Sequence, residues 1–272
     1  MSKLIENFDD FADETGYTKT QLLGPVAMPM LADAAGTTAY LAEQLMAHNF
    51  VVHDGFLGPE EAAALREEVK AYWERGMMKH GQIGQGHDAS TATTKTTWRD
   101  DHVVWLEGKE DFVGPKMQRH IMRCDILTQK LSIFFEAVAP EFSWNGAGRT
   151  KIMATRYGGD GARYVAHYDN PNRNGRRLTC ITYLNPGWTP KDGGALRVKT
   201  KGQIVEIAPL MDRLLLFWSD KRVPHEVMRA TGKDRFAVTI WYLDEDERID
   251  AERREAAEAA AAGAAAATDK KE

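Results

Sequence analysis

A histidine and an aspartate two positions apart, together with a later histidine, constrain the fold of this chain more than any other feature. His167-Tyr168-Asp169 is the only His-x-Asp sequence in the chain, and His225 follows within Val-Pro-His-Glu-Val. In an extended strand residues i and i+2 project to the same face, so His167 and Asp169 are expected to point inward while Tyr168 points away. The distant third ligand then comes from another strand, which predicts a metal site between strands.

Two imidazoles and one carboxylate form a ligand set with a definite chemistry. Neutral imidazole suits Fe(II), and a single carboxylate adds negative charge without filling the coordination sphere. Such a facial set leaves three positions open, which is the arrangement used by non-haem Fe(II) oxygenases. Taken alone, His225 is explained equally well as a hydrogen-bonded histidine at the start of a strand.

Arg235 begins an alternating apolar segment, Arg-Phe-Ala-Val-Thr-Ile-Trp-Tyr-Leu, which predicts a strand next to the histidines. Its planar guanidinium is suited to a bidentate grip on a carboxylate. An arginine at the head of a strand can also be an ordinary surface residue. The inference therefore depends on the whole group of residues.

Short alternating segments separated by turn-rich sequence dominate the second half of the chain. Strands are expected over residues 150–157, 178–184, 195–200, 204–207, 213–218 and 236–243. Many short strands of this kind predict a mainly β fold, a sandwich or barrel. Two helices with one apolar face each, one opening at Pro59 and one over about 114–138, are expected to flank it.

The stretch from about residue 151 to 248 resembles the 2-oxoglutarate- and Fe(II)-dependent prolyl hydroxylases, particularly those that act on hypoxia-inducible factor, and their protist and bacterial relatives. The matching motifs are Ala-His-Tyr-Asp-Asn-Pro-Asn (166–172), Leu-Thr-Cys-Ile-Thr-Tyr-Leu-Asn (178–185), Gly-Gly-Ala-Leu-Arg (193–197), Asp-Arg-Leu-Leu-Leu-Phe-Trp-Ser-Asp (212–220) and Val-Pro-His-Glu-Val (223–227). Fainter similarity extends the match to roughly residues 38–248. The resemblance implies a double-stranded β-helix, the cupin-like jelly roll, with flanking α-helices.

The resemblance also implies a role for individual residues. His167, Asp169 and His225 would hold Fe(II), and Arg235 would pair with the distal carboxylate of 2-oxoglutarate. The other co-substrate contacts it implies are Tyr183 on the same carboxylate, Tyr157 beside it, the apolar Ile181, Leu196 and Val227, and Thr239 near the oxygen side. By residue type alone, ordinary barrel core is the simpler explanation for Tyr157, Ile181, Leu196 and Val227.

Fewer residues are implied for the substrate. Arg176 and Asp101 match a charged pair near the substrate entrance, and Trp241 matches an aromatic residue at the active-site floor, although it can also be core. Residues 82–101 are rich in Gly, Ser and Thr and occupy the place of a mobile loop that closes over the peptide substrate. A plain surface loop is the alternative. The loop sequence departs from that of the animal enzymes, and Arg177 replaces a cysteine there.

The function implied is hydroxylation of a prolyl residue to trans-4-hydroxyproline in a cytosolic protein, with a role in oxygen sensing. It requires Fe(II), 2-oxoglutarate and O2, is supported by ascorbate, and releases succinate and CO2. Substrates in the family include hypoxia factors, an adaptor of ubiquitin ligases and an elongation factor, and the sequence does not choose among them. The alternatives are an oxygenase of a free amino acid or other small molecule, and a non-catalytic jelly-roll binding module, which would lack the metal ligands. Collagen-type prolyl hydroxylases use lysine where this chain has Arg235.

Length and composition suit one catalytic domain with extensions. The 272 residues, 43% of them hydrophobic, can bury a substantial core. The expected division is an N-terminal extension over 1–36 and an oxygenase domain over 37–248, with helical support to about 140 and the jelly roll from about 141. An Ala-rich charged tail over 249–272 is expected to be disordered or a frayed helix.

Charge and cysteine content limit the expected cellular compartment and the class of binding partner. No long apolar run or signal peptide is present, so no membrane association is expected. Cys124 and Cys180 are expected to be reduced, buried thiols, which suits the cytoplasm, or the nucleus if the source is eukaryotic. A net charge of −5 gives no footprint for nucleic acid. A monomer that binds a proline-containing protein or peptide is expected.

Overall fold

The computed structural model describes residues 18–19, 22–26, 34–82 and 98–269 of the chain. Within these ranges the strands form a five-stranded and an eight-stranded sheet. The small sheet has the order β1 (Thr18–Lys19), β10 (Gln203–Ile207), β9 (Leu196–Thr200), β12 (His225–Val227) and β7 (Tyr164–His167). The large sheet has the order β2 (Phe50–Asp54), β11 (Arg213–Trp218), β8 (Arg176–Tyr183), β13 (Arg235–Asp244), β6 (Ile152–Tyr157), β4 (His102–Leu106) and β3 (Lys79–His80), and β5 (Gly146–Arg149) pairs with β13.

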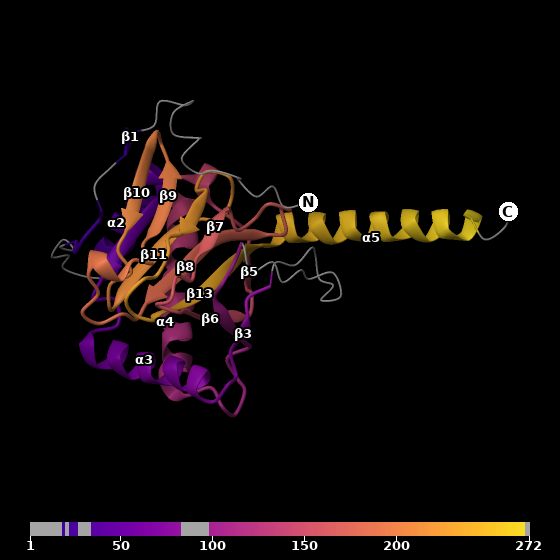
Figure 1. Ribbon diagram of the computed structural model, residues 1–272. Coiled ribbons are helices and arrows are strands. Elements are labelled where there is room, and N and C mark those ends of the chain that lie inside the picture. The colour runs from indigo at the N-terminus through magenta and orange to yellow at the C-terminus, as the bar shows by residue number, and fades with distance from the viewer. Residues whose placement is uncertain (1–17, 20–21, 27–33, 83–97, 270–272) are drawn as a thin grey trace.

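From β6 onward the chain passes back and forth between the two sheets. Strands β6, β8, β11 and β13 lie in the large sheet, whereas β7, β9, β10 and β12 lie in the small one. The pairings among these strands are antiparallel. This is the double-stranded β-helix that the family resemblance implies, and its interior lies between the two sheets (Figure 1).

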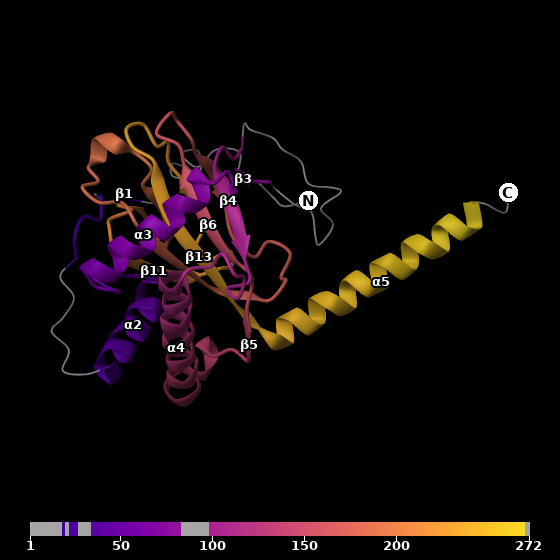
Figure 2. The same cartoon turned by 90° about the horizontal axis from the view of Figure 1, so that it is seen from below.

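Three helices cover the outer face of the large sheet, as Figure 2 shows from below. They are α2 (Ala34–His48), α3 (Pro59–Glu74) and α4 (Pro115–Val138). Proline stands in the first turn of α3 and of α4, where its missing N–H costs no hydrogen bond. Strand β11 is buried at all six positions, because helices pack on one side of it and the sheet interior lies on the other.

The first turn of α4 is capped by a side chain of the neighbouring helix. The two carboxylate oxygens of Glu68 accept hydrogen bonds from the backbone N–H groups of Lys116 (3.0 Å) and Met117 (2.9 Å). A carboxylate at a helix N-terminus satisfies donors that have no partner within the helix and interacts favourably with the helix dipole. Glu68 thus fixes α4 against α3.

Part of the predicted N-terminal extension is built into the small sheet. Residues 22–26 lie against β10, where Leu23 bridges Ile207, and Arg213 of β11 holds them there. The Arg213 side chain is fully buried, and its five N–H donors find acceptors on Asp54, Leu23, Gly24 and Ala208. Residues 22–26 of the predicted extension are therefore packed against both sheets.

The described part of the predicted tail, up to Asp269, is helical. Helix α5 (Glu245–Asp269) begins directly after β13, ahead of the expected start at residue 249, and projects from the body of the molecule (Figure 2). Its first turns are anchored, because Ala251 is buried, but residues 252–261 are exposed. Within the described ranges, no helix combines the length and apolar character that a membrane span requires.

Candidate active site

The structure brings the three predicted metal ligands together at the end of the small sheet. His167 is the last residue of β7, and His225, the first of β12, is its cross-strand partner. The Nε2 atoms of His167 and His225 lie 3.8 and 3.7 Å from Oδ1 of Asp169. One ligand atom from each of the three residues lies within 4.8 Å of the others. This spacing fits a single metal ion held by all three.

Hydrogen bonds fix the orientation of both imidazoles. Nδ1 of His167 lies 2.8 Å from the carbonyl of Val165, and Nδ1 of His225 lies 2.9 Å from that of Val223. A carbonyl oxygen can only accept, so Nδ1 of each ring carries the hydrogen and donates it. Nε2 of each ring is then the unprotonated nitrogen, available as a metal ligand.

Asp169 presents one oxygen to the site and has its other oxygen engaged. The hydroxyl of Thr179 on β8 donates to Oδ2 of Asp169 over 2.6 Å, and Oγ of Ser219 lies 2.8 Å from the same hydroxyl. Because Thr179 has one hydroxyl hydrogen and gives it to Asp169, Ser219 must donate to Thr179. Asp169 is therefore arranged as a one-oxygen ligand, supported from the large sheet.

The electrostatics favour the protonation states that a metal requires. Burial, followed by the neighbouring His225, lowers the pKa of His167 to about 3. Burial works to raise the pKa of Asp169, but His225, His167 and the bond from Thr179 outweigh it, so this pKa lies below its ordinary value. A neutral imidazole and an ionised carboxylate are the ligand forms.

Arg235 faces the metal cluster from the opposite sheet. It is 4% exposed, and its guanidinium carbon lies 4.9 Å from the ring centres of both Tyr157 and Tyr183. Among the described residues, Nε of Arg235 and the hydroxyl of Tyr183 are buried and have no hydrogen-bond partner. Unpaired buried donors are costly, so they fit a carboxylate ligand placed between the sheets.

A cavity of about 390 Å³ joins the two halves of the site. Eleven of the thirteen predicted site residues line it: His167, Asp169, His225, Arg235, Tyr157, Ile181, Leu196, Val227, Thr239, Arg176 and Trp241. Tyr183 is fully buried against Arg235, outside this lining. Tyr168 also borders the cavity, because Asp169 lies just beyond the end of β7.

The predicted charged pair of Arg176 and Asp101 is replaced by two separate interactions. Asp101 is fully buried and pairs with Arg99, with Nε to Oδ1 at 2.5 Å and Nη2 to Oδ2 at 2.9 Å. Arg176 donates to the carbonyl of Asp169 at 3.0 Å and lies over the ring of Trp241 at 4.5 Å. Arg99, two residues before Asp101 in the chain, thus takes the place predicted for Arg176.

Sequence reasoning missed several residues of this site. Thr179 lies on the same face of β8 as Ile181, so strand alternation was the signal that could have identified it. Tyr164 stacks on His167 with ring centres 3.8 Å apart, and Arg99 lies 4.8 Å from the centre of the Tyr164 ring. No sequence signal pointed to these contacts. Most of the predicted lid, residues 83–97, lies outside the described residues.

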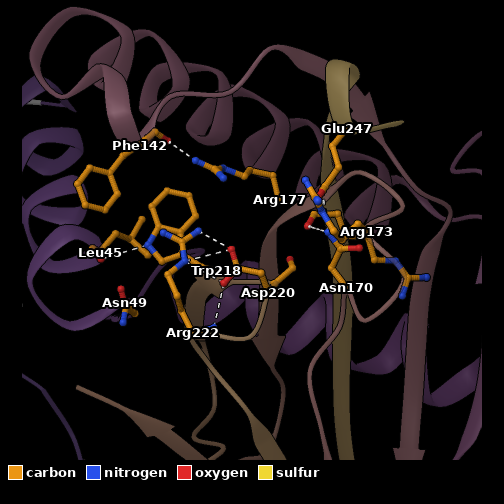
Figure 3. Close-up of polar contacts among 12 residues, drawn as sticks. Leu45, Asn49, Phe142, Asn170, Arg173, Arg177, Trp218, Asp220, Arg222 and Glu247 are labelled. Carbon is orange, nitrogen blue, oxygen red and sulfur yellow. Dashed lines mark hydrogen bonds and ion pairs between the residues drawn. The ribbon is translucent and has the colours of Figure 1, made fainter. Parts of the chain in front are cut away.

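The loop that follows Asp169 is held by the start of α5 (Figure 3). The amide nitrogen of Asn170 donates to the carbonyl of Arg176 at 2.9 Å and to Glu247 at 2.8 Å, and Arg173 pairs with Glu247 at 3.2 Å. Arg177, predicted only as a departure from the animal enzymes, donates to the carbonyl of Phe142 instead and packs 5.1 Å from the Trp218 ring (Figure 3). The loop therefore has a defined position beside the cavity.

Comparison with known proteins gives consistent matches. The model of the 2OG-Fe(II) oxygenase superfamily matches residues 152–243. The chain is 40% identical over 222 residues to human Egl nine homolog 1, covering 78% of this chain but only 48% of that protein. It is 35% identical to human prolyl hydroxylase EGLN3, covering 79% of this chain and 87% of that protein.

A solved structure supports the same relationship. It is a prolyl hydroxylase from Trichoplax adhaerens in complex with a peptide fragment of the hypoxia-inducible factor oxygen degradation domain. The match has a TM-score of 0.69 and 33% sequence identity, and it covers 79% of this chain and 92% of the other. By its sequence, its fold and its His-Asp-His cluster, this chain belongs to the 2-oxoglutarate- and Fe(II)-dependent oxygenases, in the family of the Egl nine prolyl hydroxylases.

Proposed function

We propose that the protein hydroxylates a prolyl residue of a protein or peptide, forming 4-hydroxyproline and converting 2-oxoglutarate and O2 to succinate and CO2. One observation carries this proposal. The His167–Asp169–His225 cluster and the unsatisfied Arg235 border a single cavity, each contributed by a different sheet. A metal site with open positions and a carboxylate grip facing it are what such a reaction needs.

Different residues of the cavity would bind the metal, bind the co-substrate carboxylate and exclude water. Fe(II), when bound together with 2-oxoglutarate, supplies the O2-dependent oxidative chemistry. His167, Asp169 and His225 would hold the metal, and Arg235 would orient the co-substrate through its distal carboxylate, with Tyr183 as a second donor. Ile181, Leu196 and Val227 give the cavity apolar walls, which exclude water and strengthen the polar contacts.

Aromatic rings beside the cavity suit a proline side chain. Trp105 stacks on Trp241 with ring centres 5.9 Å apart, and Arg176 covers Trp241. Trp105 is 44% exposed although it lines the cavity, so an incoming peptide can reach it. Flat aromatic surfaces bind apolar rings by packing and dispersion. The names of the relatives, which are prolyl hydroxylases, support the same substrate class.

The finer assignments extend the same proposal. We infer that the substrate belongs to the hypoxia-factor, ubiquitin-ligase-adaptor or elongation-factor class and that hydroxylation reports oxygen supply. The protein would act as a monomer in the cytoplasm, with ascorbate supporting turnover. The supporting observation for a peptide is the complex of the Trichoplax relative with a hypoxia-factor fragment.

Mass spectrometry of a panel of proline-containing peptides from the three classes tests the proposal. Each peptide is incubated with the protein, Fe(II), ascorbate and 2-oxoglutarate, and His225→Ala serves as the inactive control. We expect a gain of one oxygen on a proline that requires 2-oxoglutarate and is absent with the control. Steady succinate production with no modified peptide in the panel would contradict prolyl hydroxylation of these classes and redirect the search to other substrates.

A further inference from the structure

A second cavity, of about 200 Å³, borders Arg235 and none of the three metal ligands. Helix α3, the loop between β8 and β9, and the start of β13 form its walls. Arg235 borders both cavities, but the two share no other lining residue. Nothing in the proposed reaction uses this second cavity.

Three cationic side chains converge on the second cavity from two directions. Arg66 and Lys70 are one helical turn apart on α3, so they project from the same face of the helix. Lys233 approaches from the turn before β13. Cations supplied by separate elements can surround a compact anion, which a single helix face cannot do.

Each acidic residue of the wall already has a cationic partner, Arg156 for Asp234 and Lys233, at 3.4 Å, for Asp192. Asp234 accepts two hydrogen bonds from Arg156, at 2.6 and 2.8 Å. Asp192 accepts from the backbone and the hydroxyl of Thr189, at 2.7 and 3.0 Å, and these bonds lower its pKa. Neither carboxylate is left to balance the charge of the α3 side chains.

The partners of the two α3 cations lie toward solvent, whereas Nζ of Lys233 donates to the carbonyl of Gly187 at 2.8 Å and pairs with Asp192 at 3.4 Å. Arg66 pairs with Glu67, whose side chain is 65% exposed, and Lys70 pairs with Glu74, which is 56% exposed. Exposed pairs of this kind contribute little stability. Nε of Arg66 is buried and has no hydrogen-bond partner among the described residues. A buried guanidinium donor without a partner is costly, and an anion in the cavity would satisfy it.

We propose that this second cavity binds a phosphate group, either free or as part of a small phosphomonoester. Arg66 supplies a fork of donors and Lys70 a point charge, which is a combination suited to phosphate oxygens. Lys233, which pairs with Asp192 and Gly187, has one of its three N–H donors left for the same anion. Trp188 and Phe236 also line the cavity and can pack against the organic part of an ester. Apart from Arg235, the site shares no lining residue with the proposed catalytic centre, and binding there does not depend on catalytic activity.

Calorimetric titration of the full chain with inorganic phosphate, at constant ionic strength balanced with chloride, tests the site. We expect saturable binding that weakens at least tenfold in Arg66→Gln/Lys70→Gln. The matched control, Lys109→Gln/Lys130→Gln, removes the same charge from exposed positions outside the cavity and should bind as the unmodified protein does. If the double variant fails to fold, Lys70→Gln alone serves, because the Lys70 side chain is 40% exposed.

The outcomes of this titration separate the possibilities. No saturable binding, or equal binding by the cavity variant and the control, would overturn the proposal. A parallel titration with phenyl phosphate distinguishes the two sources of the group. Tighter binding of the ester than of inorganic phosphate identifies a phosphomonoester site, and the reverse order identifies a free-phosphate site. The readout is binding alone, so it is independent of whether prolyl hydroxylation is detected.

Discussion

At the scale of single residues, the site depends on how each polar atom is partnered. Nδ1 of His167 and of His225 is bound to a carbonyl, and Oδ2 of Asp169 is bound to Thr179. Only Nε2 of each histidine and Oδ1 of Asp169 therefore face one another. Arg235 and Tyr183 lie opposite with donors unpaired. The ligand atoms left free by these hydrogen bonds define the metal position, and the unpaired donors define the position of a carboxylate.

Replacing Arg235 with lysine tests the carboxylate grip. Lysine keeps the charge but loses the planar fork, so one charge-assisted hydrogen bond of about 1.5–3 kcal/mol is lost. We expect the half-saturating concentration of 2-oxoglutarate to rise by about ten- to a hundredfold. Steady-state kinetics measures this, with Arg119→Lys on the exposed side of α4 as the control. An unchanged value would remove Arg235 from the co-substrate site.

Thr179→Val tests the support of the metal ligand. Valine matches threonine in shape but cannot donate to Asp169, and loss of such an outer partner typically weakens metal affinity or activity by about ten- to a hundredfold. Thr182→Val is the matched control on the same strand, because the Thr182 hydroxyl is buried and has no partner among the described residues. Titration of both variants with Fe(II) measures their metal affinities, and we expect the weaker affinity in Thr179→Val. Equal affinities would rule out a positioning role for Thr179.

At the scale of secondary-structure elements, the packing of α4 depends on one carboxylate of α3. Glu68→Ala leaves two backbone N–H groups without their acceptor, which we expect to cost about 1 kcal/mol. In a chain of this size that corresponds to a fall in Tm of about 2–4 °C. Glu67→Ala, whose side chain is 65% exposed, is the control and should leave Tm unchanged. Equal Tm values for the two variants would show that the cap contributes nothing.

The elements differ in how well the sequence predicts them. Strand β11 was predicted with its observed bounds, Arg213–Trp218, because an apolar run this short between turns fits a buried strand better than a helix. The bounds of strands β7 and β12, which carry both histidines, were not predicted, since four and three residues are too few to show a period. The ligands were nevertheless found from residue type and order. The Arg99–Asp101 pair and the Tyr164–His167 stack depend on tertiary packing that no local pattern encodes.

At the scale of the whole molecule, stability is coupled to pH through a buried histidine. His120 on α4 is 1% exposed, and burial lowers its pKa to about 4. An unfolded histidine titrates near 6.5, so between about pH 6.5 and 4 the unfolded state binds the extra proton and is favoured. Above about pH 6.5 His120 is neutral in both the folded and the unfolded state, so its titration no longer affects stability. As the pH falls from about 6.5 to 4, the free energy of unfolding should decrease by about 1.4 kcal/mol per pH unit.

Urea unfolding at several pH values measures this contribution. We expect the free energy of unfolding to fall more steeply between pH 6 and 4.5 for the unmodified protein than for His120→Leu, which cannot titrate. Other groups contribute equally to both proteins, so the difference in slope belongs to His120. Parallel curves for the two proteins would contradict the assignment.

The two sheets together make the site, because the metal cluster belongs to the small sheet and Arg235 to the large one. The most direct test is an anaerobic titration of the protein with Fe(II) and then 2-oxoglutarate, followed by the visible charge-transfer absorption of the complex. We expect this absorption in the unmodified protein, its loss in His225→Ala, and a shift to higher 2-oxoglutarate concentration in Arg235→Lys. No absorption in the unmodified protein, or an unaltered titration in His225→Ala, would contradict the assignment of the metal and co-substrate site.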